Sequence, residues 1–229
     1  MKALTDELIK NIGELDEDAA LLTARTLVDS GFPAHRLMRH CLEGLRIVGR
    51  KYEEGDYYAS GLIMAGEIMR QILEMTSFRP AESAGAAAGG LARTVVLGTI
   101  VGDIHDLGKN LVGEVLKGHG FRVHDLGVDV PPEVFLSEAI RCQPDIVGIS
   151  ILISSCYPKL MKAVELVRTM MPEGYKQPGL LIGGGAVNEQ VQAKCQADIW
   201  CQDILKLGEV CRAWLDNGRP NPVCRHYVI

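Results

Sequence analysis

From residue 94 onward the sequence alternates between apolar runs and segments with helical spacing, and few folds accommodate that pattern. Thr94-Val-Val-Leu-Gly-Thr-Ile100 is a continuous apolar run, as expected of a strand buried on both faces of a sheet. Further strands are predicted at 121–124, 145–152, 179–183 and 198–201, each followed by a helical segment. Because such units join by right-handed crossovers, we expect an α/β fold: a flavodoxin-like (Rossmann-like) five-stranded parallel sheet with strand order 2-1-3-4-5.

The first part of the chain carries only helical signals. Thr5 and Asp16 are predicted to cap two short helices, and Pro33 stands where the first residue of a third would be. A fourth helix is indicated by apolar residues that recur at helical spacing over 62–72. Four short amphipathic helices with tight connections predict a small antiparallel four-helix bundle.

A Gly/Ala-rich stretch without large apolar residues separates the two parts. It runs over 80–92, and small residues of this kind are typical of an interdomain linker. The predicted organisation is therefore a helical bundle cap domain at 1–79, the linker, and an α/β domain at 93–229.

Composition and charge disfavour several functions. The formal net charge is −5 and only 5% of residues are aromatic, so we expect no nucleic-acid partner. No apolar run approaches the roughly 20 residues that a membrane helix needs, and the N-terminus is acidic where a signal peptide would be apolar. The seven cysteines form no CxxC pair, which disfavours a disulfide framework or a zinc knuckle. We therefore expect a cytoplasmic protein without a membrane partner.

Polar residues and glycines gather where three predicted strands end. Gly102-Asp-Ile-His-Asp-Leu-Gly108 follows the first strand, Ser150-Ile-Leu-Ile-Ser-Ser155 ends the third, and Gly183-Gly-Gly-Ala-Val-Asn188 follows the fourth. Ligands of doubly wound folds bind outside the carboxyl ends of the strands, at the point where the strand order reverses. The three loops are therefore predicted to open onto one edge of the sheet and to form a binding site there.

The first loop limits what this edge binds. Its two acids and histidine would repel a flavin phosphate, and glycines only at 102 and 108 do not fit the GxGxxG pattern of dinucleotide folds. A receiver domain would place an aspartate at the end of the third strand, where this chain has hydroxyls. Asp103-x-His105 suits a metal site, because a carboxylate two residues away can hold the second imidazole nitrogen. On this motif alone, a solvated loop histidine that is hydrogen-bonded to a nearby acid remains the alternative. The remaining histidines show no ligand spacing: His35, His40, His119, His124 and His226.

Together the three loops resemble the cobalamin-binding domain of B12-dependent methyltransferases, including the cobalamin-binding module of methionine synthase. The resemblance rests on Asp103-x-His105-x-x-Gly108, Ser150-x-Leu152 and the Gly184-Gly185 pair, in this order on a five-unit α/β domain. The string GTIVGDIHDLGKNLV is similar to the first loop and helix of the corrinoid proteins of methyltransfer systems. The stretch from Lys51 to Met69 resembles the helical cap of the same family, so the resemblance covers the chain from about residue 5 to 215.

This resemblance implies a role for each loop. His105 would be the lower axial ligand of cobalt, in place of the cofactor's own dimethylbenzimidazole, and Asp103 would accept the other imidazole N–H. The displaced nucleotide tail would run down a slot beside the third and fourth strands, where glycines allow close approach to the backbone. The implied cofactor-binding set, with His105 as the metal ligand, comprises Asp103, Ile104, His105, Asp106, Gly108, Asn110, Ser150, Leu152, Ser154, Cys156, Gly183, Gly184, Gly185, Leu62 and Met69.

Cys156 departs from the family pattern. Many relatives place a Ser or Thr there, whose hydroxyl completes the His–Asp relay, whereas a thiol is a weaker donor. Three outcomes stay open. Ser154, Ser155 or a water replaces that donor, the proton coupling of His105 is altered, or Cys156 merely packs as a small hydrophobic residue.

The resemblance implies a methyl carrier that is not catalytic alone. Its cobalamin or related corrinoid, as cob(I)alamin, would accept a methyl group on Co(I) from a substrate-specific corrinoid methyltransferase and become methylcobalamin. The methyl group would pass to a second methyltransferase, such as a tetrahydrofolate-linked one, and a reductive activator protein would rescue oxidised cobalt. The apolar helix from about Leu62 to Met69 would shield the methyl group and swing away for transfer.

Two alternatives share part of this pattern. The B12-binding subunit of an adenosylcobalamin-dependent mutase has Asp-x-His-x-x-Gly but is not expected to carry the helical cap. A B12-dependent sensor would share the cap and the α/β domain. It should also bring a DNA-binding module, which we do not expect because no basic helix-turn-helix pattern precedes the first helix.

Overall fold

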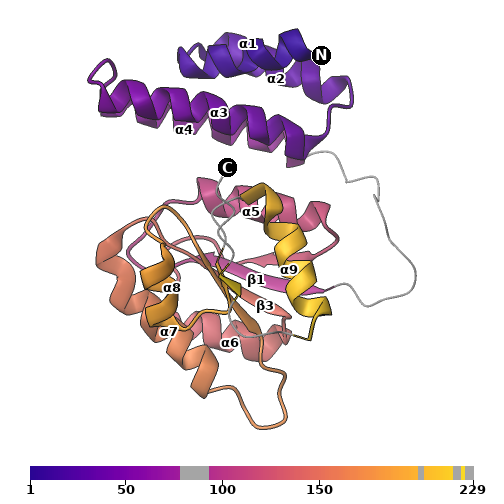
Figure 1. Ribbon diagram of the computed structural model, residues 1–229, viewed down its shortest axis with the longest axis vertical. Coiled ribbons are helices and arrows are strands. Elements are labelled where there is room, and N and C mark those ends of the chain that lie inside the picture. Colours follow the sequence, from indigo (N-terminus) through magenta and orange to yellow (C-terminus); the bar gives the residue numbers. More distant parts are fainter. Residues whose placement is uncertain (78–92, 201–203, 219–222, 225–229) are drawn as a thin grey trace. The chain divides into compact units, whose positions relative to one another are not determined.

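The computed structural model describes residues 1–77, 93–200, 204–218 and 223–224. The chain divides into two compact units, Met1–Ala84 and Gly85–Ile229 (Figure 1). The predicted linker at 80–92 lies outside the described residues, so its bounds and those of the two domains stay a prediction.

The first unit consists of four helices, α1 (Lys2–Gly13), α2 (Glu17–Asp29), α3 (Ala34–Glu53) and α4 (Ala59–Ser77). Helix α1 packs against α2 and α3, and α4 contacts the same two helices, which confirms the predicted helical bundle. Asp16 caps α2 as predicted, since its Oδ1 accepts the N–H of Ala19 at 3.1 Å. The predicted cap at Thr5 is wrong, because α1 begins at Lys2 and the Thr5 hydroxyl donates to the Lys2 carbonyl inside the helix. None of the described helices is long and apolar enough to cross a membrane.

The second unit is built on a parallel sheet. Its strands are β1 (Thr94–Thr99), β2 (Arg122–Asp125), β3 (Ile146–Ser150), β4 (Gly179–Gly183), β5 (Ile199–Trp200) and β6 (Val223–Cys224). They lie in the order β2-β1-β3-β4-β5-β6, and every neighbouring pair is parallel. The first five strands confirm the predicted 2-1-3-4-5 order. The sixth, a two-residue strand beside β5, was not predicted.

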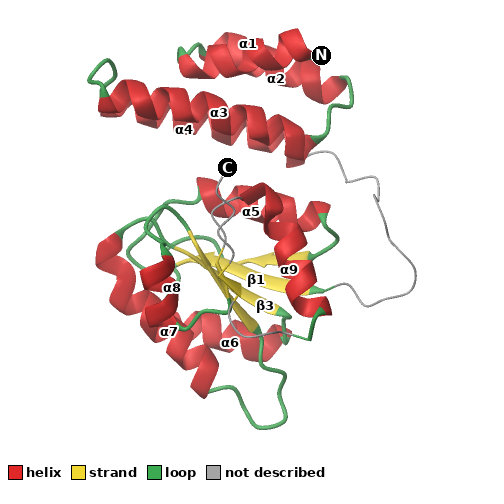
Figure 2. Cartoon of the chain, viewed as in Figure 1, coloured by secondary structure: helices red, strands yellow, loops and turns green. Residues whose placement is uncertain are grey.

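Helices cover both faces of this sheet (Figure 2). They are α5 (Leu107–Gly118), α6 (Pro132–Cys142), α7 (Tyr157–Thr169), α8 (Glu189–Cys195) and α9 (Leu207–Asp216), with short 3-10 turns at Ser154–Cys156 and Ile204–Lys206. Helix α5 packs with α9 on one face, whereas α6, α7 and α8 pack in series on the other. The sheet is therefore doubly wound.

Burial on both faces of the sheet explains why the sequence of β1 is one continuous apolar run. Val95 belongs to the core cluster that contains Trp214 of α9, whereas Val96 belongs to the cluster on the opposite face, with Phe135 of α6. Successive side chains of a strand point to opposite faces, so a strand between two helical layers needs apolar residues at every position. Both tryptophans, Trp200 and Trp214, therefore lie in the core.

Candidate functional site

The carboxyl ends of three adjacent strands meet at one edge of the sheet. Thr99 at the end of β1 pairs with Ser150 at the end of β3, and Ser150 pairs with Gly183 at the end of β4. The three loops that were predicted to share an edge therefore start side by side.

A tight turn after β1 places Asp103 in the interior. Gly102 adopts φ +88°, a left-handed conformation that favours glycine, and its N–H donates to Asp129 Oδ1 at 2.7 Å. The Asp103 N–H donates back to the Ile100 carbonyl at 3.1 Å, and the Asp103 side chain is fully buried. A carboxylate held there needs hydrogen-bond donors on both oxygens, because an unpaired buried charge is costly.

The Asp103 carboxylate receives those donors from two loops. Its Oδ1 accepts the N–H of His105 at 3.1 Å and the ring Nδ1–H of His105 at 2.7 Å. Its Oδ2 accepts the backbone N–H groups of Leu152 at 2.6 Å and Ile153 at 3.1 Å. Asp103 thus joins the loop after β1 to the loop after β3.

Those contacts keep Asp103 ionised. Burial raises its pKa, but the hydrogen bonds from Leu152, His105 and Ile153 act in the opposite direction and outweigh burial, so the pKa lies below its ordinary value. Because an ionised carboxylate only accepts hydrogen bonds, the shared proton resides on Nδ1 of His105. In the neutral form of this imidazole, the lone pair is therefore on Nε2.

His105 presents that nitrogen at the surface. Its side chain is 52% exposed although its ring is fixed by Asp103, and the Thr99 hydroxyl anchors its backbone carbonyl at 3.1 Å. Within the described residues, Nε2 has no hydrogen-bond partner. A neutral imidazole whose far nitrogen is held by a carboxylate is the usual arrangement of a metal-ligating histidine. A solvated loop histidine that is hydrogen-bonded to a nearby acid has the same contacts, so the ligand role of His105 stays a prediction.

Cys156 does not take part in the contact between His105 and Asp103. It is buried in the core cluster on the α6 and α7 face, where it packs as a small hydrophobic residue. The Oδ2 atom of Asp103 accepts from the backbone N–H groups of Leu152 and Ile153, and within the described residues no hydrogen bond joins it to the side chains of Ser154, Ser155 or Cys156. Sequence reasoning missed this solution because backbone donors leave no signature in side-chain identity.

Glycines leave space for a large flat ligand at this edge. A Cβ on Gly184, which adopts φ +116°, would overlap the Ile151 carbonyl, so the two backbones lie in close contact there. By contrast, a Cβ on Gly108 or Gly183 would meet nothing within 4 Å. Leu152, which lies against Gly185, and Ile104, in the loop that carries His105, are exposed apolar side chains at the same edge.

The other predicted site residues differ in burial and belong to both units. Ser150 is half-buried and Ser154 is exposed at the same edge, while Gly185 lies beside Leu152. In the helical unit, Leu62 is 40% exposed, whereas Met69 is fully buried among the helices. Met69 is thus placed as core in this structure, and we carry only Leu62 forward as a candidate contact.

A buried lysine that sequence reasoning missed stabilises the start of α5. Lys109 is almost fully buried, and its Nζ contacts Asp125 Oδ2 at 2.5 Å and Asn110 Oδ1 at 2.6 Å. Asn110 in turn donates to Asp106 Oδ2 at 3.1 Å. These contacts tie the helix that follows His105 to the end of β2. The only sign of this contact in the sequence was the lysine directly after Gly108.

We expect Gly184→Ala to destabilise the α/β unit by about 3 kcal/mol or more, because the methyl group overlaps the Ile151 carbonyl and the backbone stays left-handed. Chemical denaturation of the purified protein measures this. Gly183→Ala is the matched control, since its methyl group meets open space. Equal stabilities of the two variants would contradict the close approach of the two backbones.

Two regions of the chain match families described as B12 binding domain, at residues 4–76 and 93–204. A corrinoid protein of Desulfitobacterium hafniense (strain Y51) is 30% identical over 205 residues, which cover 87% of this chain and 92% of that protein. Dimethylamine corrinoid protein 1 of Methanosarcina acetivorans is 29% identical over 213 residues, covering 90% and 97%. The solved monomethylamine corrinoid protein of Methanosarcina barkeri has the same fold, with a TM-score of 0.77, 21% identity and coverage of 91% and 97%.

The fold, the edge site and these matches define a B12-binding protein. More narrowly, the chain belongs to the family of corrinoid proteins. The residues present fit such a cofactor, because an imidazole nitrogen suits cobalt, and open space at Gly108 and Gly183 admits a bulky ring system.

Proposed function

We propose that this protein is a methyl carrier that works between two methyltransferases and is not catalytic alone. When bound, cobalamin supplies a cobalt that accepts a methyl group from one partner and releases it to another. The observation that carries the proposal is the half-exposed His105 ring, held through Nδ1 with Nε2 presented. The similarity to dimethylamine corrinoid protein 1 supports the methyl-transfer assignment.

The chain's own residues position and tune the cofactor. His105 would hold the cobalt through Nε2, while Asp103 fixes the ring and holds the proton at Nδ1. An ionised Asp103 makes Nε2 a better electron donor than an isolated imidazole would be. The open space at Gly183 would admit the displaced nucleotide tail, with Gly185 and the side chain of Leu152 packed against each other nearby.

For the helical unit we propose a protective role toward the methyl group. Leu62, Ile63 and Met64 of α4 are exposed apolar side chains, which suits a surface that excludes water from a reactive ligand. The match of residues 4–76 to a B12-binding family favours a methyl carrier over the mutase subunit, which is not expected to have this helical unit.

The proposed partners are a substrate-specific corrinoid methyltransferase, a second methyltransferase such as a tetrahydrofolate-linked one, and a reductive activator. A labelled methyl group tests the carrier role. The cobalamin-loaded chain is reduced and treated with carbon-14 iodomethane, and one label per cobalt should co-purify with the protein. Addition of a tetrahydrofolate-linked methyltransferase should then move the label to the folate. A chain that takes up no label, or that binds only adenosylcobalamin, would contradict the proposal.

A further inference from the structure

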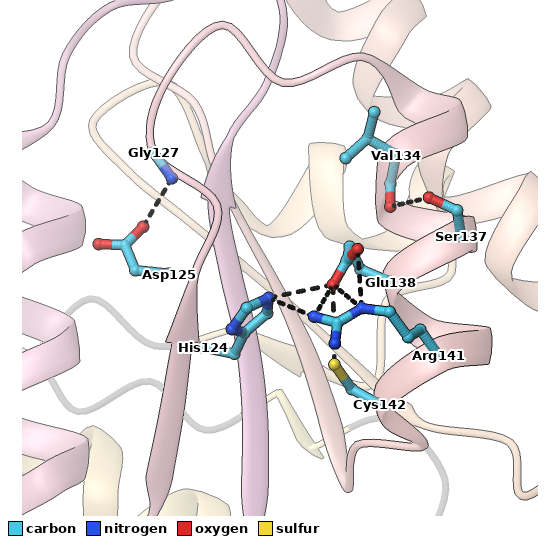
Figure 3. Close-up of polar contacts among 8 residues, drawn as sticks. All are labelled: His124, Asp125, Gly127, Val134, Ser137, Glu138, Arg141 and Cys142. Carbon is cyan, nitrogen blue, oxygen red and sulfur yellow. Dashed lines mark hydrogen bonds and ion pairs between the residues drawn. The ribbon is translucent and has the colours of Figure 1, made fainter.

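Three side chains that bind transition metals converge on the surface between β2 and α6, in a part of the fold that the corrinoid site does not use (Figure 3). His124 lies on the edge strand β2, and Glu138 and Cys142 lie one turn apart on α6. One ligand atom from each lies within 4.8 Å of the other two. The sequence alone gave His124 no ligand spacing, because its partners follow 14 and 18 residues later (138 − 124 and 142 − 124) on a different element.

The distances are close to those of a tetrahedral metal site. His124 Nε2 lies 3.0 Å from Glu138 Oε2, and Cys142 Sγ lies 3.7 Å from the same oxygen. In a tetrahedral zinc site, neighbouring ligand atoms are roughly 3.3–3.6 Å apart, given bonds of about 2.0–2.3 Å. Small rotations of these three side chains would therefore bring their ligand atoms around one ion.

Arg141 now occupies the centre of this cluster. Its Nη2 lies 2.5 Å from Glu138 Oε2 and 3.0 Å from His124 Nε2 (Figure 3). Nε2 cannot satisfy both neighbours, because it either donates a proton to Glu138 or accepts one from Arg141. A metal ion accepts the lone pairs of both His124 and Glu138 and removes this conflict. The Arg141 side chain is 61% exposed, so it can leave the cluster for solvent.

We propose that His124, Glu138 and Cys142 form a binding site for a divalent transition-metal ion of zinc type, with Arg141 as the side chain that the ion displaces. Imidazole, carboxylate and thiolate are the three protein ligands that zinc prefers, and a solvent molecule completes the tetrahedron. On binding, Cys142 gives up its thiol proton to solvent, so that its sulfur ligates as a thiolate. The bound ion would fasten the edge strand β2 to α6.

Equilibrium dialysis of the cobalamin-loaded full chain against zinc chloride tests the proposal. Loading with cobalamin occupies His105, so that this histidine does not compete for zinc. Zinc and cobalt are then counted by elemental analysis, and we expect one zinc per chain. X-ray absorption at the zinc edge should show one sulfur at about 2.3 Å and nitrogen or oxygen at about 2.0–2.2 Å.

Variants separate this site from other zinc-binding groups. His124→Ala and Cys142→Ala should each weaken zinc binding at least about a hundredfold, and Cys142→Ala should also remove the sulfur signal. Arg141→Ala should strengthen binding roughly fivefold, because it removes the competing ion pair. Cys195→Ala and His40→Ala are the matched controls and should bind zinc as the unchanged chain does. An unaltered cobalamin spectrum shows that each variant is folded.

Several results would overturn the proposal. These are zinc bound without sulfur, binding that survives both His124→Ala and Cys142→Ala, or no binding by the unchanged chain and by Arg141→Ala. The zinc result is independent of the proposed methyl-carrier role. Dialysis measures bound zinc, whereas the iodomethane label measures methyl transfer.

Discussion

Asp103→Asn is expected to weaken both the fold and the cobalamin site, although the two side chains have nearly the same shape. The carboxylate accepts two N–H groups of His105 on one oxygen and those of Leu152 and Ile153 on the other. An asparagine has one acceptor oxygen, so in either orientation its NH₂ group faces two donors. We expect the free energy of unfolding to fall by about 2 kcal/mol or more, since each buried donor left unsatisfied costs about 1–3 kcal/mol.

The same change should lower the affinity for cobalamin by about 10- to 100-fold, because the imidazole loses the group that orients it. Denaturation of the cofactor-free chain and a spectroscopic cobalamin titration measure the two effects separately. Asp145→Asn is the matched control: its carboxylate accepts the Thr94 N–H at 2.8 Å and pairs with Lys176 at the other end of the sheet. It should lower stability without changing cobalamin affinity. If Asp103→Asn bound cobalamin as tightly as the unchanged chain, Asp103 would have no orienting role.

His105→Ala should have the largest effect on the bound cofactor and little effect on the fold. The imidazole is half-exposed and makes one side-chain hydrogen bond, so its removal leaves the core intact. We expect the variant to retain some corrinoid in a form without the histidine ligand, with affinity reduced at least about a hundredfold. The visible spectrum of the reconstituted protein reports the change in axial ligation.

Free imidazole supplies the control for this variant. Added to His105→Ala, it should occupy the vacated position and restore the spectrum of the ligated cofactor. His40→Ala, in the helical unit, should leave the spectrum unchanged. A His105→Ala protein whose axial signature matches that of the unchanged chain would exclude His105 as the ligand.

The parts of the fold that follow from burial were predictable from the sequence. A strand between two helical layers must be apolar at every position, so the run from Thr94 to Ile100 indicated a central strand. The alternation with helices then indicated a parallel, doubly wound sheet, and 2-1-3-4-5 was predicted because it is the commonest order of five such strands. The Asp103 contact with His105 was also predictable, because a two-residue spacing in an extended loop allows it.

The remaining features depend on contacts between elements that are distant in sequence. Strand β6 pairs only two residues with β5, and two residues have no detectable strand pattern. The backbone donors of Leu152 and Ile153 reach Asp103 only because β1 and β3 are neighbours in the sheet. Likewise, His124 meets Glu138 only once α6 has packed beside the edge strand.

A bond between Nε2 of His105 and cobalt is the central prediction, and isotope labelling tests it directly. The chain is produced with nitrogen-15 histidine, loaded with cobalamin of natural isotopic abundance and reduced to paramagnetic Co(II). In the electron paramagnetic resonance spectrum, a nitrogen-15 ligand splits each cobalt line into a doublet, whereas nitrogen-14 gives a triplet. We predict doublets, and their loss in His105→Ala. Triplets, which would come from the cofactor's own base, or lines without nitrogen splitting would contradict the assignment of His105.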